Sequence, residues 1–357
     1  MSIRLGLCCM NTILREQKPP VFMSRGIVLK TIYNSKIIDL KSLILNNLKK
    51  IIEITGYQKG QGKKVLRALI IEHFKEISKL AGMEKIKELV IKNLEDGIKL
   101  LEWNKENNIY VMRLSSEIFP HKTNPKIIGY DYDFAISYLK KLGSLANHFK
   151  HRLTFHPGQF NVIGTADERI FKQTLLELKH HADLLDLMEM GKDSVMVIHG
   201  GGVYGDKEKT IKRWIENFNR LPLNVQSRLV LENCEKSYNI EDCLYISSKV
   251  NIPVVFDTHH YDCYNILHPD HRLKQASDYI CDILKTWTKR GIRPKFHVSE
   301  QAEGGRVGKH SDYIENLPTY LLEIPKKYNL GIDIMIEAKM KEQAILKLYS
   351  KYPELNK

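Results

Sequence analysis

A short run of apolar residues in the second half of the chain ends abruptly in an acid and two histidines. Residues 254–256 follow Pro253 and are typical of a buried strand in a parallel sheet. Asp257 and His260 come directly after this run and are costly to bury unless something compensates their polarity. A metal ion at the carboxyl end of the strand would do so. From this stretch alone, a capped turn whose side chains bond to the backbone is the alternative.

The same arrangement recurs along the chain. Apolar runs predict eight strands, at residues 3–8, 109–114, 152–155, 194–198, 228–231, 253–256, 295–298 and 332–336. Apolar residues at helical spacing predict helices between them, at residues 84–107, 131–149, 168–190, 207–219, 240–250, 273–290 and 313–328. Strands that alternate with helices imply a parallel sheet with right-handed crossovers. Eight such units predict an α/β fold of the closed (β/α)8 TIM-barrel type. A seven-stranded or doubly wound sheet is the alternative.

In a barrel, the carboxyl ends of all strands meet at one mouth, so side chains far apart in sequence would converge there. Histidines and carboxylates end six of the strands or follow them: His156, His199, Glu232, Asp257, His260, His297 and Glu337. Each has an ordinary alternative: a histidine in a turn, Glu232 as a helix cap, Glu337 as a partner of Lys339. Together they form a nitrogen and oxygen set that suits Zn or Mn. Neighbouring carboxylates would repel without cations, and this many ligands implies two or three ions.

The composition limits the kind of substrate. The formal net charge of +13 favours a polyanionic partner such as nucleic acid, although a lysine-rich surface alone would also produce it. Metal ions a few Å apart activate water and stabilise charge on a phosphate, so a basic metalloprotein suits phosphodiester hydrolysis. A sugar isomerase would use metals on a similar barrel but needs no excess of basic residues.

The cysteines and the apolar runs indicate the compartment. Six scattered cysteines without a CxxC pair predict a reduced, intracellular protein. The first residues lack the apolar core of a signal peptide, and no apolar run reaches the roughly 18 residues of a membrane helix. We therefore expect an intracellular protein with no membrane contact. We also expect a monomer, with residues 1–357 forming a single catalytic domain.

The region before residue 84 follows a different pattern. Residues 12–36 are predicted to form a long loop. Residues 37–83 are predicted to form a helical insertion after the first strand, with helices at about 37–52 and 65–82. Between them, residues 56–64 form a basic, glycine-rich turn that could bind phosphates through lysines and backbone N–H groups. A flexible surface loop is the alternative, and the turn has no Walker spacing.

Ten short segments, in order, resemble the UV damage endonuclease family. They are RLG at 4–6, NT at 11–12, RLSS at 113–116, FHPGQ at 155–159, HGG at 199–201, LEN at 231–233, FDTHH at 256–260, KFHVS at 295–299, HSDY at 310–313 and IEAK at 336–339. The resemblance runs from residue 3 to about residue 345, interrupted by the insertion at 37–83. The combination of motifs is specific, whereas no single one would suffice.

This resemblance implies a barrel related to the apurinic endonucleases of the xylose-isomerase-like group. It implies nicking of damaged double-stranded DNA immediately 5′ to cyclobutane pyrimidine dimers and 6-4 photoproducts, with abasic sites as further substrates. It also implies a cluster of three metal ions, usually Mn2+, with Zn2+ or Mg2+ as alternatives. The metal ligands on the family's pattern are His156, His199, Glu232, Asp257, His260, His297, His310 and Glu337. Glu232 and Asp257 are the expected bridging, catalytic carboxylates.

Four further residues take roles from the resemblance. Lys295 lies two residues before His297, so both face the same side of one strand. The matching lysine of the family can be carboxylated near the metals, and an ordinary ion pair is the alternative. Gln159 matches a residue that probes the damaged duplex, and Asn11 matches a polar residue near the cluster. Leu7 stands where members often carry an aromatic wedge; an apolar wedge can unstack bases but loses aromatic stacking.

We therefore predict a metal-dependent DNA repair endonuclease with Glu232, Asp257 and Lys295 in catalytic roles. A general apurinic/apyrimidinic endonuclease is the nearest alternative among enzymes. A lesion-binding protein without catalysis is the alternative from another class, although binding alone does not require eight metal ligands.

Overall fold

The computed structural model describes residues 2–29, 61–125 and 129–357, and of residues 61–81 the backbone alone. Eight parallel strands form one sheet in this part of the chain, in the order β3-β2-β1-β8-β7-β6-β5-β4. They are β1 Ile3–Cys8, β2 Val111–Arg113, β3 Arg152–Thr154, β4 Met196–His199, β5 Leu229–Glu232, β6 Val254–Asp257, β7 Lys295–Val298 and β8 Ile332–Ile336. A parallel bridge between Phe155 and Met196 joins the two ends of the sheet. The predicted TIM barrel is therefore confirmed, and the open-sheet alternative is wrong.

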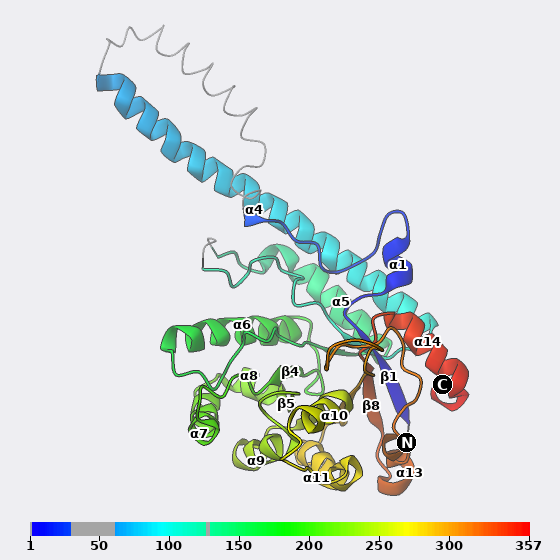
Figure 1. Ribbon diagram of the computed structural model, residues 1–357. Helices are drawn as coiled ribbons and strands as arrows, with labels where there is room; N and C mark the ends of the chain where they lie inside the picture. The colour runs from blue at the N-terminus through cyan, green and yellow to red at the C-terminus, as the bar shows by residue number, and fades with distance from the viewer. Residues whose placement is uncertain (1, 30–60, 126–128) are drawn as a thin grey trace.

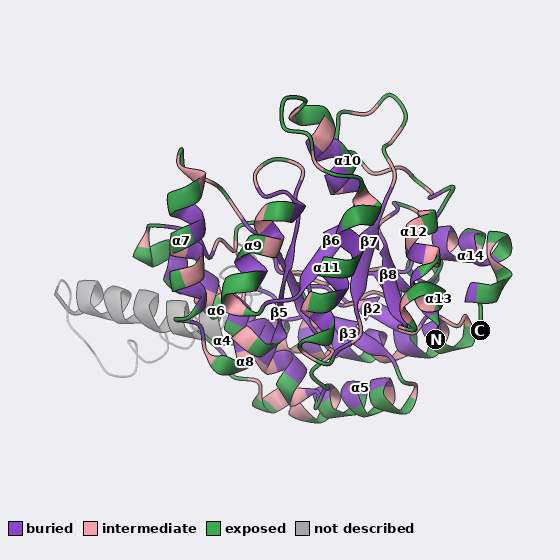
Figure 2. Cartoon of the chain, turned by 90° about the horizontal axis from the view of Figure 1, so that it is seen from below, coloured by how far each residue is buried: buried purple, intermediate pink, exposed green. Residues whose placement is uncertain are grey.

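Helices surround the strands (Figure 1). They are α1 Thr12–Glu16, α4 Gln61–Glu106, α5 Ile136–His148, α6 Glu168–Leu187, α7 Lys207–Phe218, α8 Leu223–Arg228, α9 Ile240–Val250, α10 Thr258–Leu267, α11 Ala276–Thr288, α12 Thr319–Leu322, α13 Ile324–Tyr328 and α14 Lys341–Lys351, with 3-10 turns η1 Asp133–Ala135 and η2 Pro353–Leu355. In Figure 2 the helices are buried where they face the strands and exposed on their outer sides. This is the pattern of amphipathic helices around a barrel.

Several predicted boundaries need correction. Residues 12–16 of the expected loop form α1, and the expected helix at 313–328 is two short helices, α12 and α13. Prolines at 318 and 325 lie at the start of these two helices, where a missing N–H is tolerated. Helices α8, α10 and α14 were not predicted.

The long helix α4 differs most from the sequence prediction. It runs without a break through Gly82, where a helix was expected to end, and it includes residues 61–64 of the expected glycine-rich turn. A single glycine inside a helix costs only about 1 kcal/mol, which the flanking helix-forming residues can offset. The first half of α4 projects away from the barrel (Figure 1). The predicted helix at 37–52 and residues 56–60 of the turn lie outside the described residues, so the insertion at 37–83 stays a prediction.

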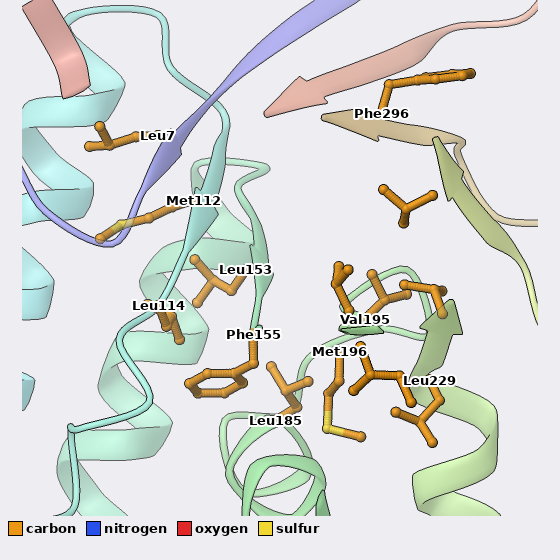
Figure 3. Packing of buried hydrophobic residues seen from close by; sticks show 14 of the residues in the cluster. Leu7, Met112, Leu114, Leu153, Phe155, Leu185, Val195, Met196, Leu229 and Phe296 are labelled. Atoms are coloured by element: carbon orange, nitrogen blue, oxygen red, sulfur yellow. The ribbon is translucent and has the colours of Figure 1, made fainter. Parts of the chain in front are cut away.

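The main apolar core lies between the strands and the helices, while the interior of the barrel is largely polar. On β1, Leu5 and Leu7 belong to this core. Figure 3 shows Leu7 pointing outward from the strand. Arg4 points inward, where its guanidinium forms an ion pair with Asp333 of β8 at 2.7 Å. Cys8 also lies inside, in a small cluster with Val111 and Met335. The alternation of a strand thus decides which β1 side chains can reach the barrel interior.

The structure also shows the state of the cysteines and the character of the helices. All six cysteines are free. Of the helices in the described ranges, none has the length and apolar character needed to cross a bilayer.

Candidate metal centre at the barrel mouth

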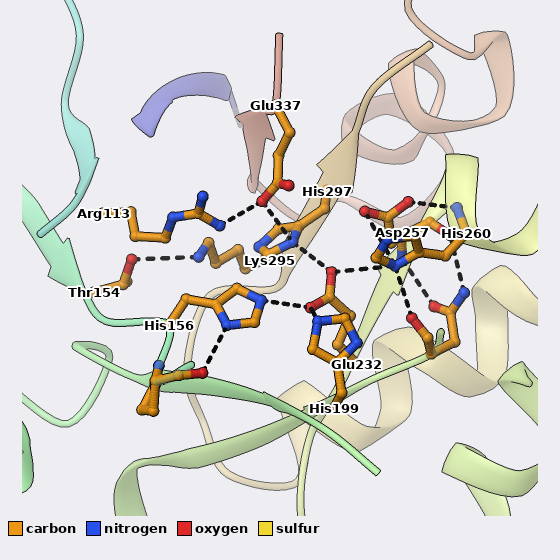
Figure 4. A network of polar contacts seen from close by, with 12 residues as sticks. Arg113, Thr154, His156, His199, Glu232, Asp257, His260, Lys295, His297 and Glu337 are labelled. Carbon is orange, nitrogen blue, oxygen red and sulfur yellow. Dashed lines mark hydrogen bonds and ion pairs between the residues drawn. The ribbon is translucent and has the colours of Figure 1, made fainter. Parts of the chain in front are cut away.

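Glu232, the last residue of β5, lies at the centre of a ring of four histidines (Figure 4). Its Oε2 atom is 2.9 Å from Nε2 of His156 and 3.4 Å from Nε2 of His199. Its Oε1 atom is 2.6 Å from Nδ1 of His297 and 3.9 Å from Nδ1 of His260. These histidines come from four different strand ends, and closure of the barrel brings them together.

Two more carboxylates flank this ring. Oδ2 of Asp257 is 3.6 Å from Nδ1 of His260, and Oε1 of Glu337 is 3.3 Å from Nδ1 of His297. Potential ligand atoms within 4.8 Å of one another form three groups: His156, Glu232 and His297; Glu232, Asp257 and His260; Asp257, His297 and Glu337. Glu232, Asp257 and His297 each belong to two of these groups. Such sharing is what carboxylates that bridge neighbouring ions would require.

His310 lies at the edge of the cluster. The centroid of its ring is 6.5 Å from that of His260 and 5.6 Å from that of His259. It belongs to none of the three close groups found in the described residues. The structure therefore brings His310 to the mouth without placing it in contact with the central carboxylates.

The residues of the cluster fit a divalent cation. Asp257 Oδ2 and His297 Nε2 are buried, and neither has a hydrogen-bond partner among the described residues. A buried polar atom without a partner is costly, and carboxylate oxygen and imidazole nitrogen are ligands for Mn and Zn. The other Asp257 oxygen accepts a hydrogen bond from the backbone N–H of His260 at 2.8 Å. The capped turn expected as an alternative is therefore present, and it leaves one oxygen of the same carboxylate available.

A hydrogen-bonded asparagine positions this part of the mouth. Asn233 exchanges two hydrogen bonds with the backbone of Asp257: its Nδ2 donates to the carbonyl at 3.0 Å, and its Oδ1 accepts from the N–H at 2.9 Å. Nδ1 of His260 lies 3.1 Å from the carbonyl oxygen of Asn233. A histidine held at one ring nitrogen by a backbone carbonyl is the usual arrangement of a metal ligand.

The electrostatics of the cluster also favour bound cations. Burial would raise the pKa of Glu232, but His297 and His199 hold it well below its usual range. Burial, with a contribution from Glu232, raises the pKa of Asp257 to about 7. Burial opposes the charged form of His260, yet Asp257 and Glu232 raise its pKa to about 9. Protons on Asp257 and His260 thus supply positive charge that divalent cations would replace.

Lys295 and Arg113 lie beneath the carboxylates. Nζ of Lys295 is fully buried and donates to Oγ1 of Thr154 at 3.3 Å. Burial, together with the nearby charges of Arg113 and Arg152, lowers the pKa of Lys295 to about 7. Arg113 donates from its guanidinium to Oε1 of Glu337 at 2.5 Å. Sequence reasoning used Arg113 only as part of a motif and missed this contact; an arginine at a strand end near carboxylates was the available signal.

The three residues expected to contact DNA differ in their surroundings. Leu7 is only 1% exposed and packs in the apolar core outside the barrel (Figure 3). The expectation that Leu7 lies beside a lesion at the mouth is therefore wrong, because strand alternation turns Cys8 inward instead. Asn11 is buried and caps α1, where its Oδ1 accepts from the N–H of Leu14. Gln159 is exposed on the loop after β3.

An exposed aromatic residue follows Gln159. Phe160 is 84% exposed, and both residues lie in a turn closed by the N–H of Asn161, which donates to the carbonyl of Gly158 at 3.0 Å. Sequence reasoning passed over Phe160, because the residue type alone does not determine whether a loop aromatic is exposed.

A cavity of about 710 Å3 lies at the opposite end of the barrel. Its lining includes Ser2 and Arg4 from the start of β1, together with Lys105, Tyr110 and Lys150. None of the expected metal ligands, all of which are described residues, lines this cavity. It is therefore separate from the metal centre.

Comparisons with known proteins agree with this geometry. The model of the family described as UV-endonuclease UvdE matches residues 3–357. The putative UV-damage endonuclease of Acanthamoeba polyphaga mimivirus is 35% identical over 354 residues, covering 98% of this chain and 91% of that protein. The UV-damage endonuclease of Schizosaccharomyces pombe is 34% identical, but this chain spans only 50% of its length. The crystal structure of SacUVDE matches with a TM-score of 0.72 and 26% identity, covering 99% of this chain and 100% of that one.

Proposed function

Because the chain belongs to the UV-endonuclease UvdE family, and is therefore a nuclease, we propose that it is a metal-dependent DNA repair enzyme. Its reaction is hydrolysis of the phosphodiester bond immediately 5′ to cyclobutane pyrimidine dimers and 6-4 photoproducts in double-stranded DNA. Abasic sites are further substrates, and the enzyme acts as a monomer. The observation that carries this proposal is the position of Glu232 among four histidines at the barrel mouth.

The cofactor is a cluster of three divalent ions, expected to be Mn2+, with Zn2+ or Mg2+ as alternatives. The residues that would hold it are His156, His199, Glu232, Asp257, His260, His297, His310 and Glu337. The mixed donor set, the three overlapping groups and the two buried atoms without partners support this assignment. Such ions, when bound, lower the pKa of a coordinated water and stabilise charge on a phosphate.

The side chains of the site differ in how deeply they are buried, and their proposed roles follow from this difference. Asp257 and His297 are fully buried, whereas the side chains of His156 and His199 keep 15% and 25% of their surface exposed. The scissile phosphate must therefore approach on the side of His156 and His199. Glu232 holds these two histidines toward the buried ligands, and Arg113 holds the Glu337 carboxylate from below. Carboxylation of Lys295 is part of the proposal, supported by its burial and its lowered pKa.

DNA binding follows from charge and from exposed groups at the mouth. The net charge of +13 favours contacts with phosphates, which position a duplex without reading its sequence. Gln159 is the proposed lesion probe, since its side chain is exposed and can bond to the edges of unpaired bases.

The test is a nicking assay on UV-irradiated and untreated plasmid, with chelator and with Mn2+ added back. Glu232→Gln should abolish nicking and reduce the number of bound metal ions, while binding to damaged DNA stays close to that of the wild type. Glu354→Gln is the matched control, because Glu354 is exposed and lines the cavity at the other end of the barrel. Wild-type nicking by Glu232→Gln would refute the metal assignment.

The same assay separates the alternatives. Cleavage of abasic DNA without cleavage of UV-damaged DNA would favour the general apurinic endonuclease. Tight binding of UV-damaged DNA with no cleavage under any metal condition would favour the lesion-binding protein.

A further inference from the structure

Tyr204 is an exposed aromatic residue on the loop that carries one of the candidate metal ligands. The loop spans residues 200–206 and connects His199, the last residue of β4, to Lys207, the first residue of α7. The side chain of Tyr204 is 55% exposed. Because βα loops surround the mouth of a TIM barrel, this ring lies on the same face of the molecule as the metal centre.

The backbone at Tyr204 is unusual for an aromatic residue. The N–H of Asp206 donates to the carbonyl of Val203 at 3.0 Å and closes a turn with Tyr204 and Gly205 at its centre. Both central residues have positive φ angles, 48° at Tyr204 and 78° at Gly205. Turns of this kind favour glycine and asparagine at both positions, and a bulky side chain there is disfavoured. An exposed ring gains little from burial, so folding alone does not explain a tyrosine here.

The surroundings of the loop leave it little freedom. A Cβ atom added to Gly200 would lie 2.4 Å from the ring of Tyr238, and one added to Gly201 would lie 2.9 Å from the side chain of Val162. Oγ1 of Thr210 on α7 donates to the carbonyl of Val203 at 2.8 Å. The start of the loop is therefore closely packed and its turn is anchored to α7 through Val203, whereas an added Cβ at Gly205 would meet no atom within 4 Å.

The same loop is tied to the loop that carries Gln159. The guanidinium of Arg213 lies 5.8 Å from the centroid of the Tyr204 ring, and its Nε donates to the carbonyl of Gly164 at 2.7 Å. Gly164 and Val162 both belong to the loop after β3. The proposed lesion probe and the Tyr204 ring thus occupy two loops that pack directly against each other.

We propose that Tyr204 is a base-stacking residue that receives a nucleobase exposed when the DNA opens at a damaged step. This inference rests on the proposed function. Opening the duplex leaves bases without stacking partners, and every base offers a flat face to an aromatic ring. A solvent-exposed ring on the loop that follows His199 supplies such a surface. Since stacking does not depend on hydrogen bonds, the hydroxyl of Tyr204 is not required.

The experiment compares the holoenzyme with Tyr204→Ala, Tyr204→Phe and Tyr204→Trp. The matched control is Tyr245→Ala, because Tyr245 is 50% exposed on α9 and has Lys249 Nζ at 5.1 Å from its ring centroid. The substrate is a duplex with one photoproduct and 2-aminopurine beside it, with a phosphorothioate at the cleavage site to slow hydrolysis. Binding is followed by fluorescence anisotropy, and base stacking by the emission of 2-aminopurine.

Tyr204→Ala should weaken binding to the damaged duplex by about 5- to 150-fold, the range that base–aromatic stacking supplies. The emission of 2-aminopurine in the complex should rise, because a base that has left the duplex stack loses the quenching that the Tyr204 ring supplies, while metal content stays unchanged. Tyr204→Phe and Tyr204→Trp should restore both binding and quenching. Tyr245→Ala should match the wild type.

Equal binding and quenching by wild type and Tyr204→Ala would overturn the proposal. A Tyr204→Phe variant as weak as Tyr204→Ala would overturn it as well, since it would assign the effect to the hydroxyl. Failure of the proposed function has a different signature. In that case wild-type protein leaves an ordinary UV-damaged duplex without a phosphorothioate uncut, while the binding and quenching ratios still decide the role of Tyr204.

Discussion

Asp333 provides a direct test of the electrostatic account of the barrel interior. It lies on β8, is 0% exposed, and accepts hydrogen bonds from three guanidinium groups. Arg4 and Arg293 donate to Oδ1, each at 2.7 Å, and Arg152 donates to Oδ2 at 2.8 Å. Asp333→Asn keeps the shape of the side chain but removes the negative charge that these three cations share.

The contribution of Asp333 to folding stability follows from the pKa of its carboxyl group. Burial alone would raise the pKa of Asp333, but the three arginines lower it from 3.8 to about 2. A shift of this size corresponds to about 2 kcal/mol of folding stability. Because the pKa is lowered on folding, this stability is present above pH 3.8 and is lost as the pH falls toward about 2. Asp333→Asn also leaves buried cations without a partner, so its total cost at neutral pH is about 3–5 kcal/mol.

The assay is urea unfolding of wild type and Asp333→Asn between neutral pH and pH 2. The control is Asp282→Asn, which breaks an exposed ion pair with Lys285 on α11 and should cost less than about 1 kcal/mol. The gap between wild type and Asp333→Asn should shrink as the pH falls. A gap below 1 kcal/mol at neutral pH, or one independent of pH, would refute this reasoning.

Three further substitutions test, one at a time, core packing, lesion recognition and the positioning of a metal ligand. Leu7→Ala should lower the free energy of unfolding by about 2–5 kcal/mol, measured in urea, and leave the ratio of nicking on damaged to undamaged DNA unchanged, since Leu7 is a core residue. Gln159→Ala should lower that ratio without changing metal content or melting temperature; an unchanged ratio would place the probe elsewhere. Arg113→Met should weaken Mn2+ binding in a metal titration by about 10- to 100-fold, with partial recovery in Arg113→Lys. Wild-type affinity in Arg113→Met would show that Glu337 needs no such support.

The barrel could be predicted because short apolar runs indicate its strands and apolar residues at helical spacing indicate its helices. β1, β7 and β8 have the predicted bounds, since apolar residues that face the outer core alternate along each of them with residues that face the barrel interior. A parallel barrel then brings all carboxyl ends together, whatever their separation along the chain. This rule predicted that Glu232 and the histidines would meet at one mouth, whereas the central position of Glu232 among them comes from the structure.

The remaining features depend on orientation and exposure, which residue types alone do not determine. Leu7 was placed at the mouth by its position in a motif, whereas the alternation of β1 turns it into the core. Phe160 and Tyr204 are exposed, and each lies at the centre of a hydrogen-bonded turn. The break expected at Gly82 did not occur, because one glycine is a weak signal within a helix as long as α4.

The polar layers inside the barrel depend on one another. At the floor, Asp333 is shared by Arg4, Arg152 and Arg293, so cations outnumber carboxylates there. Burial lowers the pKa of Lys295, and Arg113 and Arg152 add to this effect, so that the pKa is about 7. A neutral amine can attack carbon dioxide, whereas an ammonium group cannot, and the carbamate that forms releases a proton and carries a negative charge. An excess of arginine around Lys295 therefore favours both the neutral amine and the carbamate. The arginine-rich interior thereby favours an additional anion directly beneath the proposed metal ligands.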